Sequence, residues 1–183
     1  MFLVALATIL AAQSLTARVD RDQLHIAAPR MHFLRGEALD RLRNGATVNY
    51  LFQLAARIDR TGRVLARNAE RFAVSYDLWE EKFAVTKLGS APRTVSHLSS
   101  EAAEAWCIDN TSIPLAAIPG NSPFWLRLDY QADSPAAAAS DSQDNSGFSM
   151  AVLVDIFSRR TRAEQIQGSE EAGPLRLENL KRK

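Results

Sequence analysis

The stretch ATVNYLFQLAARID, from Ala46 to Asp59, has the most regular hydrophobic pattern in this 183-residue chain. Every second position from Val48 to Ile58 is apolar, and the residues between them are polar except for Leu51 and Ala55. Successive side chains of a β-strand point to opposite faces of its sheet. A period of two over this length therefore predicts a long strand with one face in a hydrophobic core.

A second segment with the same period is FWLRLDYQ, from Phe124 to Gln131. Its odd and even positions again separate into an apolar face and a mixed face, and the mixed face carries Trp125 and Arg127. Exposed Trp and Arg side chains are the residue types enriched at protein-interface hot spots. We therefore name Trp125 and Arg127 as candidate interface residues. The alternative, which the sequence leaves equally open, is that a short helix covers them.

The segment RFAVSYDLWEEKFAVTKLG, from Arg71 to Gly89, predicts a β-hairpin. Apolar residues alternate on both sides of a polar turn, which we place at Asp77–Glu80, so that Val74 pairs with Phe83. Asp77 suits the start of this turn, because its carboxylate can accept a backbone N–H two residues further on. The alternative is a catalytic pair among these acids, but no neighbouring group in the sequence would shift their pKa values. The hairpin tip is the favoured interpretation.

Shorter segments complete the predicted domain. ARVDRDQLHIAA, residues 17–28, predicts one opening strand, and EALDRLRNG, residues 37–45, predicts a short helix that ends at Asn44-Gly45. HLSSEAAEAWCIDN, residues 97–110, predicts a second helix, with Ser99 or Ser100 as its N-cap. The face expected to be apolar consists of Ala102, Ala105 and Trp106.

The N-terminal segment MFLVALATILAAQSLTA, residues 1–17, contains no charged side chain. An apolar run followed by small residues is typical of a secretory signal peptide, with cleavage expected after Ser14 or Ala17. An uncleaved membrane anchor is the alternative, because the run approaches the length of about 17 residues that can span a bilayer. A buried first helix is a further alternative.

The C-terminal third differs in composition from the rest. Residues 134–147 belong to an Ala/Ser/Asp-rich tract without periodicity, which predicts a linker or surface loop. Residues 148–183 are expected to form a C-terminal helix and tail, although the apolar run FSMAVLVDIF also fits a strand. A basic cluster follows this run, and it either ends the helix in solvent or docks on anionic lipid or a partner. The cluster consists of Arg159, Arg160 and Arg162.

Composition and motifs argue against several classes of function. The 22 Lys and Arg residues nearly balance the 21 Asp and Glu residues, so no broad basic surface is expected and nucleic acid is disfavoured as a partner. The single cysteine, Cys107, cannot form an internal disulfide and is expected to be a buried small hydrophobe. The three histidines, His25, His32 and His97, lack the close spacing of metal ligands. We find no catalytic or phosphate-binding motif, and we expect no cofactor.

The segments EALDRLRNGATVNYLFQLAARID, RFAVSYDLWEEKFAVT, SSEAAEAW and FWLRLDYQ together resemble an exported bacterial family, the one grouped as domain of unknown function 4390. The similarity covers about Arg18 to Asp133 and consists of patterns rather than catalytic signatures. It implies an exported, β-rich domain without established activity, and no site residue carries over from it.

These observations predict a mostly β, α+β fold: an antiparallel β-sandwich-like domain at residues 18–133, with two or three short peripheral helices. The predicted function is a non-enzymatic interaction module of the bacterial cell envelope, located in the periplasm or at the inner membrane. It would bind an envelope protein and make a possible peripheral membrane contact. The alternative is a periplasmic carrier of a small apolar ligand or lipid, in which the sheets enclose a cavity.

Overall fold

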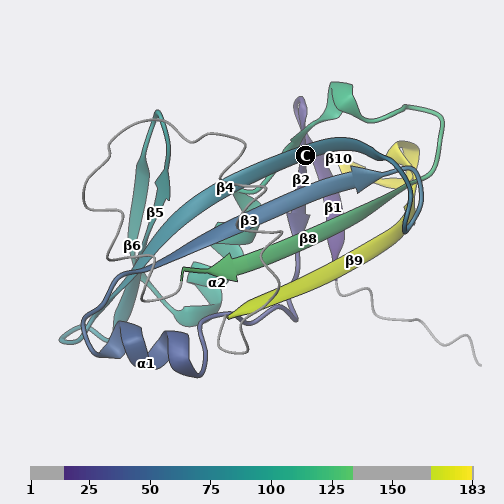
Figure 1. Cartoon of the computed structure of the whole chain (residues 1–183). Helices are drawn as coiled ribbons and strands as arrows, with labels where there is room; N and C mark the ends of the chain where they lie inside the picture. The colour runs from purple at the N-terminus through teal and green to yellow at the C-terminus, as the bar shows by residue number, and fades with distance from the viewer. Residues whose placement is uncertain (1–14, 134–165, 183) are drawn as a thin grey trace, which may run out of the picture.

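The long alternating segments form the centre of a six-stranded sheet, here called the larger sheet (Figure 1). The computed structural model describes residues 15–133 and 166–182. All neighbouring strands of the larger sheet are antiparallel. In spatial order they are β6 (Arg93–Leu98), β5 (Lys82–Leu88), β4 (Val64–Asp77), β3 (Val48–Arg57), β8 (Phe124–Ala132) and β9 (Gln167–Leu175).

A second, smaller sheet lies behind the larger one in Figure 1. Its order is β10 (Lys181–Arg182), β1 (Thr16–Asp20), β2 (Gln23–Ala27) and β7 (Ile113–Pro114). Only the β1–β10 pair is parallel among these strands. The helices are α1 (Glu37–Arg43) and α2 (Ser100–Asp109), with two 3-10 turns, η1 (Leu115–Ala117) and η2 (Leu177–Asn179). The predicted mostly β, sandwich-like α+β fold is confirmed.

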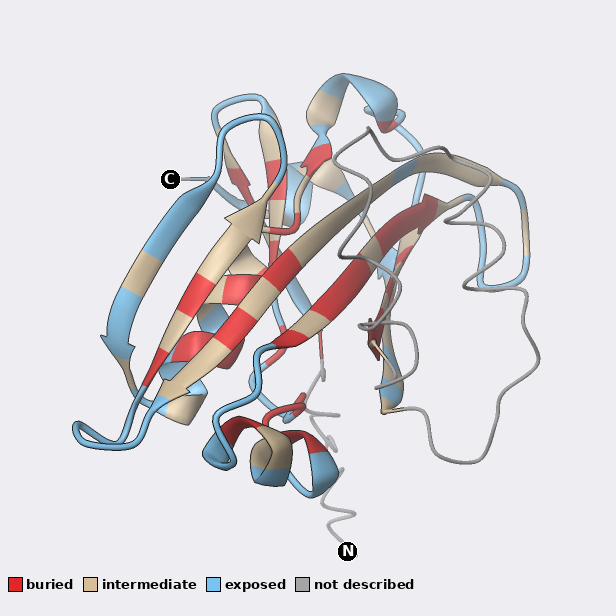
Figure 2. Cartoon of the chain, turned by 60° about the vertical axis from the view of Figure 1, so that its left-hand side comes forward, coloured by how far each residue is buried: buried red, intermediate tan, exposed pale blue. Residues whose placement is uncertain are grey.

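The inward faces of β3 and β8 form the core, as their periodicity predicts. Five alternate residues of β3 are fully buried, and the apolar positions of β8 from Phe124 to Tyr130 are buried as well. Figure 2 shows buried residues recurring along the strands of the larger sheet. Leu51 and Ala55, on the other face of β3, are also buried. Ile58 is 44% exposed, contrary to the prediction, because β3 ends at Arg57.

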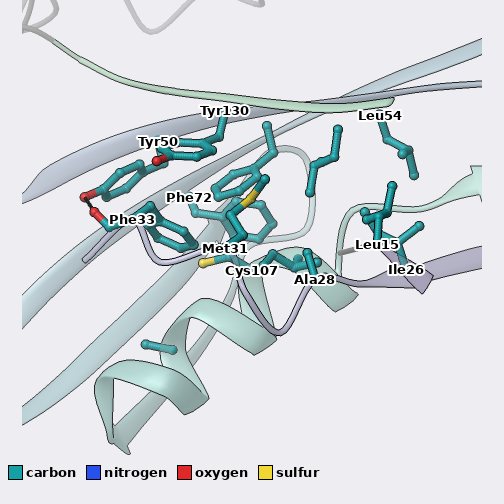
Figure 3. Packing of buried hydrophobic residues seen from close by; sticks show 14 of the residues in the cluster. Leu15, Ile26, Ala28, Met31, Phe33, Tyr50, Leu54, Phe72, Cys107 and Tyr130 are labelled. Carbon is teal, nitrogen blue, oxygen red and sulfur yellow. Dashed lines mark hydrogen bonds between the residues drawn. The ribbon is translucent and has the colours of Figure 1, made fainter. Parts of the chain in front are cut away.

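An aromatic cluster fills the middle of this core (Figure 3). The ring of Phe33, from the segment between β2 and α1, lies 4.8 Å from that of Tyr50 and 5.6 Å from that of Tyr130. The Tyr50 hydroxyl donates a hydrogen bond to the Phe33 carbonyl over 3.2 Å. Burial raises the pKa of Tyr50. Phe33 therefore fixes the segment that joins the two sheets.

The opening strand is in fact a hairpin, in which β1 pairs with β2. The chain reverses at Arg21, whose φ of 51° lies in the left-handed region that a non-glycine residue rarely adopts. Aspartates stand on both sides of Arg21, and Asp favours turns, so the sequence carried a signal for the reversal that the prediction of one strand overlooked. Leu15 is fully buried and Thr16 pairs with Ala27. Cleavage after Ala17 would remove both residues from the domain, whereas cleavage after Ser14 would leave β1 complete.

The β4–β5 hairpin has the predicted faces but a different register. Val74 pairs with Val85, and Asp77 with Lys82, so the turn is Leu78–Glu81 rather than Asp77–Glu80. Pairing has moved by two residues relative to the prediction. A two-residue change keeps each side chain on its face, which is why the apolar residues of both strands still point into the core.

The two helices occur where the sequence predicts them. α1 buries Ala38 and Leu42 and is followed by Gly45, whose φ is 82°. α2 begins after Ser99, whose hydroxyl accepts a hydrogen bond from the Ala102 N–H over 3.2 Å. The predicted apolar face of α2 is wrong, because the helix buries a neighbouring face instead. The buried residues are Ala103, Glu104, Cys107 and Ile108.

The C-terminal part of the chain extends the larger sheet. β9 pairs with β8 from Gln131 to Phe124, so the predicted domain boundary at residue 133 and the predicted tail from residue 148 are corrected. Three further predictions lie outside the described residues. They are the linker at 134–147, the helix at the start of the predicted tail, and the basic cluster Arg159, Arg160 and Arg162. Among residues 15–133 and 166–182, no helix has the length and apolar character needed to cross a membrane.

Candidate functional site

The tip of the β4–β5 hairpin exposes two large apolar side chains. Trp79 is 96% exposed and Leu78 is 57% exposed, and the other large apolar residue exposed in the described part of the chain is Ile58. β4 runs from the turn beside Ile58 to the turn that carries Trp79. The two exposed sites therefore lie at opposite ends of this strand.

The conformation of this tip is fixed by Asp77. Its Oδ1 accepts hydrogen bonds from the backbone N–H of Trp79, over 2.8 Å, and of Glu80, over 3.0 Å. These bonds favour the ionised carboxylate and lower the pKa of Asp77. The role predicted for Asp77 at the turn is confirmed. Glu81 closes the turn with a φ of 53°.

His97 connects the hairpin tip to β6. Its Nε2 lies 2.9 Å from Oε2 of Glu80, and its own φ is 61°. The β5–β6 ladder is irregular where it passes this end of the hairpin, between Phe83 and Val85. A second strand therefore supports the turn from the side.

A groove lies along α2 on the side of the smaller sheet, with a volume of about 650 Å³. Its walls are the outward face of α2 and the segment from the end of β2 to His32. Most of the lining is apolar, and it includes the three residues that the sequence assigned to the apolar face of α2. The apolar lining residues are Ile26, Ala27, Ala28, Pro29, Met31, Ala102, Ala105, Trp106 and Ile108.

A buried carboxylate holds one end of the groove. Glu104 is only 4% exposed, and its Oε1 accepts hydrogen bonds from the backbone N–H groups of Phe33 and Leu34 over 2.7 and 2.8 Å. Its Oε2 lies 2.9 Å from Nδ1 of His32. A carboxylate accepts, so Nδ1 carries the proton and Nε2 is the remaining ring nitrogen of His32. Glu104 therefore fastens the groove wall to α2.

The other end of the groove is closed by Asp109. Its carboxylate forms an ion pair with Arg18, which raises the pKa of the arginine. Its backbone carbonyl accepts a hydrogen bond from Nδ1 of His25 over 2.8 Å. These contacts join the C-terminal end of α2 to both strands of the β1–β2 hairpin.

Trp125 and Arg127 lie on the outer face of β8, as predicted, and both are half-buried. They are covered by β9 and the β3–β4 turn rather than by a helix. A Cβ at Gly173 would lie 2.5 Å from Cδ2 of Trp125, and the Arg60 guanidinium lies 5.4 Å from the Trp125 ring centroid. Both positions therefore pack against the chain itself.

The charge of Arg127 is matched within the chain. Its Nε lies 2.9 Å from Oδ1 of Asp129, and its Nη1 lies 3.1 Å from Oε1 of Glu171. These two carboxylates raise the pKa of the guanidinium, although partial burial opposes the shift. The sequence did not identify β9, and so could not show Glu171 beside this arginine. A role for Trp125 and Arg127 in binding a partner stays a prediction.

The cysteine and the three histidines considered in the sequence do not form a common site in the described part of the chain. Cys107 is fully buried, as predicted, and burial raises the pKa of its thiol. His25, His32 and His97 contact three different carboxylate-bearing residues, namely Asp109, Glu104 and Glu80. Within residues 15–133 and 166–182, no three His, Cys, Asp or Glu residues gather in a geometry that could hold a metal ion.

Comparison of the chain with protein-family models, curated proteins and solved structures found no match in any of the three. The resemblance to the exported bacterial family thus stays a prediction. The molecule's own geometry offers two candidate binding features, the hairpin tip and the groove along α2.

Proposed function

We propose that this protein is a non-enzymatic interaction module that binds a partner protein through the tip of its β4–β5 hairpin. The observation that carries the proposal is the 96% exposure of Trp79 on a turn fixed by Asp77. Tryptophan is highly buried on average in folded proteins, so a nearly fully exposed one is unusual. Trp is also among the residues that contribute most to binding when a partner encloses them.

The rigidity of the tip supports this role. Binding costs less entropy when the contacting residue is already held in its bound position. The backbone of Trp79 and Glu80 is held by the Asp77 carboxylate, and Glu80 is held by His97. The backbone of the turn therefore needs no ordering when a partner encloses Trp79.

The charge around Trp79 indicates the chemistry of the partner. Asp77, Glu80 and Glu81 flank the two apolar residues in sequence, where Lys82 is the one basic residue, and His97 pairs with Glu80. A matching surface is an apolar pocket with a basic rim. An anionic bilayer is a poorer match, because its negative surface potential repels these carboxylates.

The cell envelope is the proposed location, in the periplasm or at the inner membrane. The uncharged apolar segment at residues 1–17 supports export, as does the resemblance to an exported family. The partner would then be another envelope protein. A carrier whose sheets enclose a ligand is less well supported. The ring of Phe33 packs directly against Tyr50 and Phe52 of β3, so aromatic side chains fill the core where such a ligand would lie (Figure 3).

The proposal is tested by placing a photo-crosslinking amino acid at Leu78 in one variant and at Ile58 in a matched control. Both residues are exposed and apolar, but they lie at opposite ends of β4. We expect a protein adduct from cells that appears with the probe at position 78 and not with the probe at position 58. The captured protein, once purified, should bind the wild-type chain at least tenfold more tightly than the Trp79→Ala variant.

Two outcomes would overturn the proposal. One is identical adducts from both positions, and the other is unchanged affinity of the purified partner for Trp79→Ala. Sedimentation with vesicles of phosphatidylethanolamine and phosphatidylglycerol tests the membrane alternative. Binding to them that is lost in Trp79→Ala would replace the protein partner with a lipid surface.

A further inference from the structure

The apolar face of α2 is larger than the core requires. α2 packs against β5 of the larger sheet and β2 of the smaller one, and it buries the face that contains Ala103 and Cys107. Its neighbouring face carries Ala102, Ala105 and half-buried Trp106, and this face lines the groove. Trp106 also packs edge-on against the buried ring of Phe72, so the apolar surface that this face leaves to the groove consists of Ala102, Ala105 and the uncovered part of Trp106.

The groove has the dimensions of a site for a chain-like molecule. α2 rises about 15 Å over its ten residues, and the groove lining follows it from Glu101 to Asp109. Its volume of about 650 Å³ falls within the usual range for small-molecule sites. A straight aliphatic chain of about a dozen carbons matches this length and could lie between Trp106 and the wall formed by Ala28 and Met31.

The charges that line the groove favour a cation. The lining contains one fixed cation, Arg18, and three carboxylates, Glu101, Glu104 and Asp109. Even with His32 protonated, the carboxylates remain in excess. Arg18 is paired with Asp109, so the excess negative charge lies at the other end, near His32.

The start of α2 does not reverse this preference. A helix N-terminus favours negative charge, but Glu101 in the first turn already provides it. Backbone N–H and the hydroxyls of Ser99 and Ser100 lower the pKa of Glu101, which keeps its carboxylate ionised. The carboxylate of Glu101 can accept a hydrogen bond from an ammonium group at this end of the groove.

We infer that this groove binds a single-chain amphiphile with an ammonium head group. The chain lies along the apolar face of α2, and the head group lies at the end formed by His32, Glu101 and Glu104. This site is separate from the hairpin tip, so it stands whether or not Trp79 binds a partner protein.

The experiment measures binding of three probes with the same twelve-carbon chain to the purified full-length protein. Dodecylamine, dodecanol and sodium dodecanoate are titrated below their micelle concentrations by isothermal titration calorimetry at pH 7.5. We expect one molecule of dodecylamine per chain and at least tenfold weaker binding of dodecanoate. Octylamine should bind more weakly than dodecylamine, since each buried methylene adds favourable free energy.

Ala105→Leu tests whether the groove is the site. Ala105 is exposed on α2, so a larger side chain there occupies the groove without entering the core. We expect at least tenfold weaker binding of dodecylamine. Ala116→Leu is the matched control, because Ala116 is also exposed but lies in η1, outside the groove lining. It should bind like the wild type, and circular dichroism should show both variants folded.

Glu101→Lys tests the choice of head group. The substitution places a cation at the His32 end, so dodecanoate should then bind better than dodecylamine. The inference is overturned if dodecylamine does not bind, if dodecanol or dodecanoate binds the wild type equally well, or if Ala105→Leu leaves the affinity unchanged. It is also overturned if Glu101→Lys does not alter the order of the probes.

Discussion

The hairpin tip and the groove along α2 both leave apolar surface outside the core, but they are built in different ways. The tip is convex, and its conformation depends on an exposed carboxylate, that of Asp77, bonding to its own turn. The groove is concave, and its wall depends on a buried carboxylate, that of Glu104, bonding to a segment 70 residues away in sequence. Local bonds suffice to present one side chain, whereas a shaped hollow requires contacts distant in sequence.

This contrast predicts that substitutions behind the groove cost far more stability than substitutions at the tip. The largest effect is expected for Phe33→Ala, which removes a fully buried ring from the aromatic cluster. Replacement of a buried Phe by Ala costs about 3–5 kcal/mol. Urea denaturation should show this loss. A loss below about 1 kcal/mol would mean that Phe33 does not anchor the segment.

Glu104→Ala should have the next largest effect. It leaves the buried N–H groups of Phe33 and Leu34 without an acceptor, which costs about 1–3 kcal/mol for each unsatisfied group. Glu104→Gln is the control, because its carbonyl can still accept from these N–H groups. The Gln variant should be the more stable of the two in urea denaturation. Equal stability would show that the bonds to Oε1 contribute little.

Asp77→Ala, which removes the acceptor, or a fall in pH should loosen the tip with little effect on the rest of the domain. The folded-state pKa of Asp77 lies below the value of about 3.9 typical of an unfolded chain. The stabilisation is therefore fully present above that value and is lost as pH falls through the lower, folded-state pKa. In the wild type, NMR should show the Trp79 and Glu80 amide signals shifting in this acidic range. Signals that do not respond would contradict the observed turn.

Trp79→Ala should have the smallest effect on stability, because its side chain is 96% exposed and contributes almost no burial. The midpoint of thermal unfolding should match that of the wild type within about 1 °C. Trp106→Ala is the comparison, since Trp106 is half-buried and packs edge-on against Phe72 at 5.8 Å. A marked destabilisation by Trp79→Ala would mean that the tip packs against another part of the chain.

The sequence predicted those parts of the fold that depend on local pattern. Alternation in β3 and β8, the Asn44-Gly45 stop and the Ser99 cap each act within a few residues. The bond from the Trp79 N–H to Asp77 is equally local, and the sequence predicted it as well. The turn position itself was shifted, because a two-residue change in pairing leaves the faces unchanged.

The remaining features depend on contacts distant in sequence. β8 and β9 pair although more than 30 residues of sequence, including 134–165, lie between them. His32 and Glu104 are 72 residues apart, so no spacing rule predicts that they meet. The one available signal for the groove was the stripe of Ala102, Ala105 and Trp106. This stripe correctly indicated an apolar face of α2, but it did not show that the helix would pack on the core with the adjacent face, which contains Ala103 and Cys107.

The composition of β9 has a consequence for how this molecule avoids self-association. Among the strands that the structure describes, β9 is an outer one of the larger sheet, and an outer strand offers unpaired backbone groups to other chains. Pro174 lacks an N–H to donate, and Glu170 adds a charge that repels the same residue of a second copy of the strand. These residues disfavour growth of the sheet from one molecule into the next, so the protein can expose an apolar hairpin tip without forming β-aggregates along this edge.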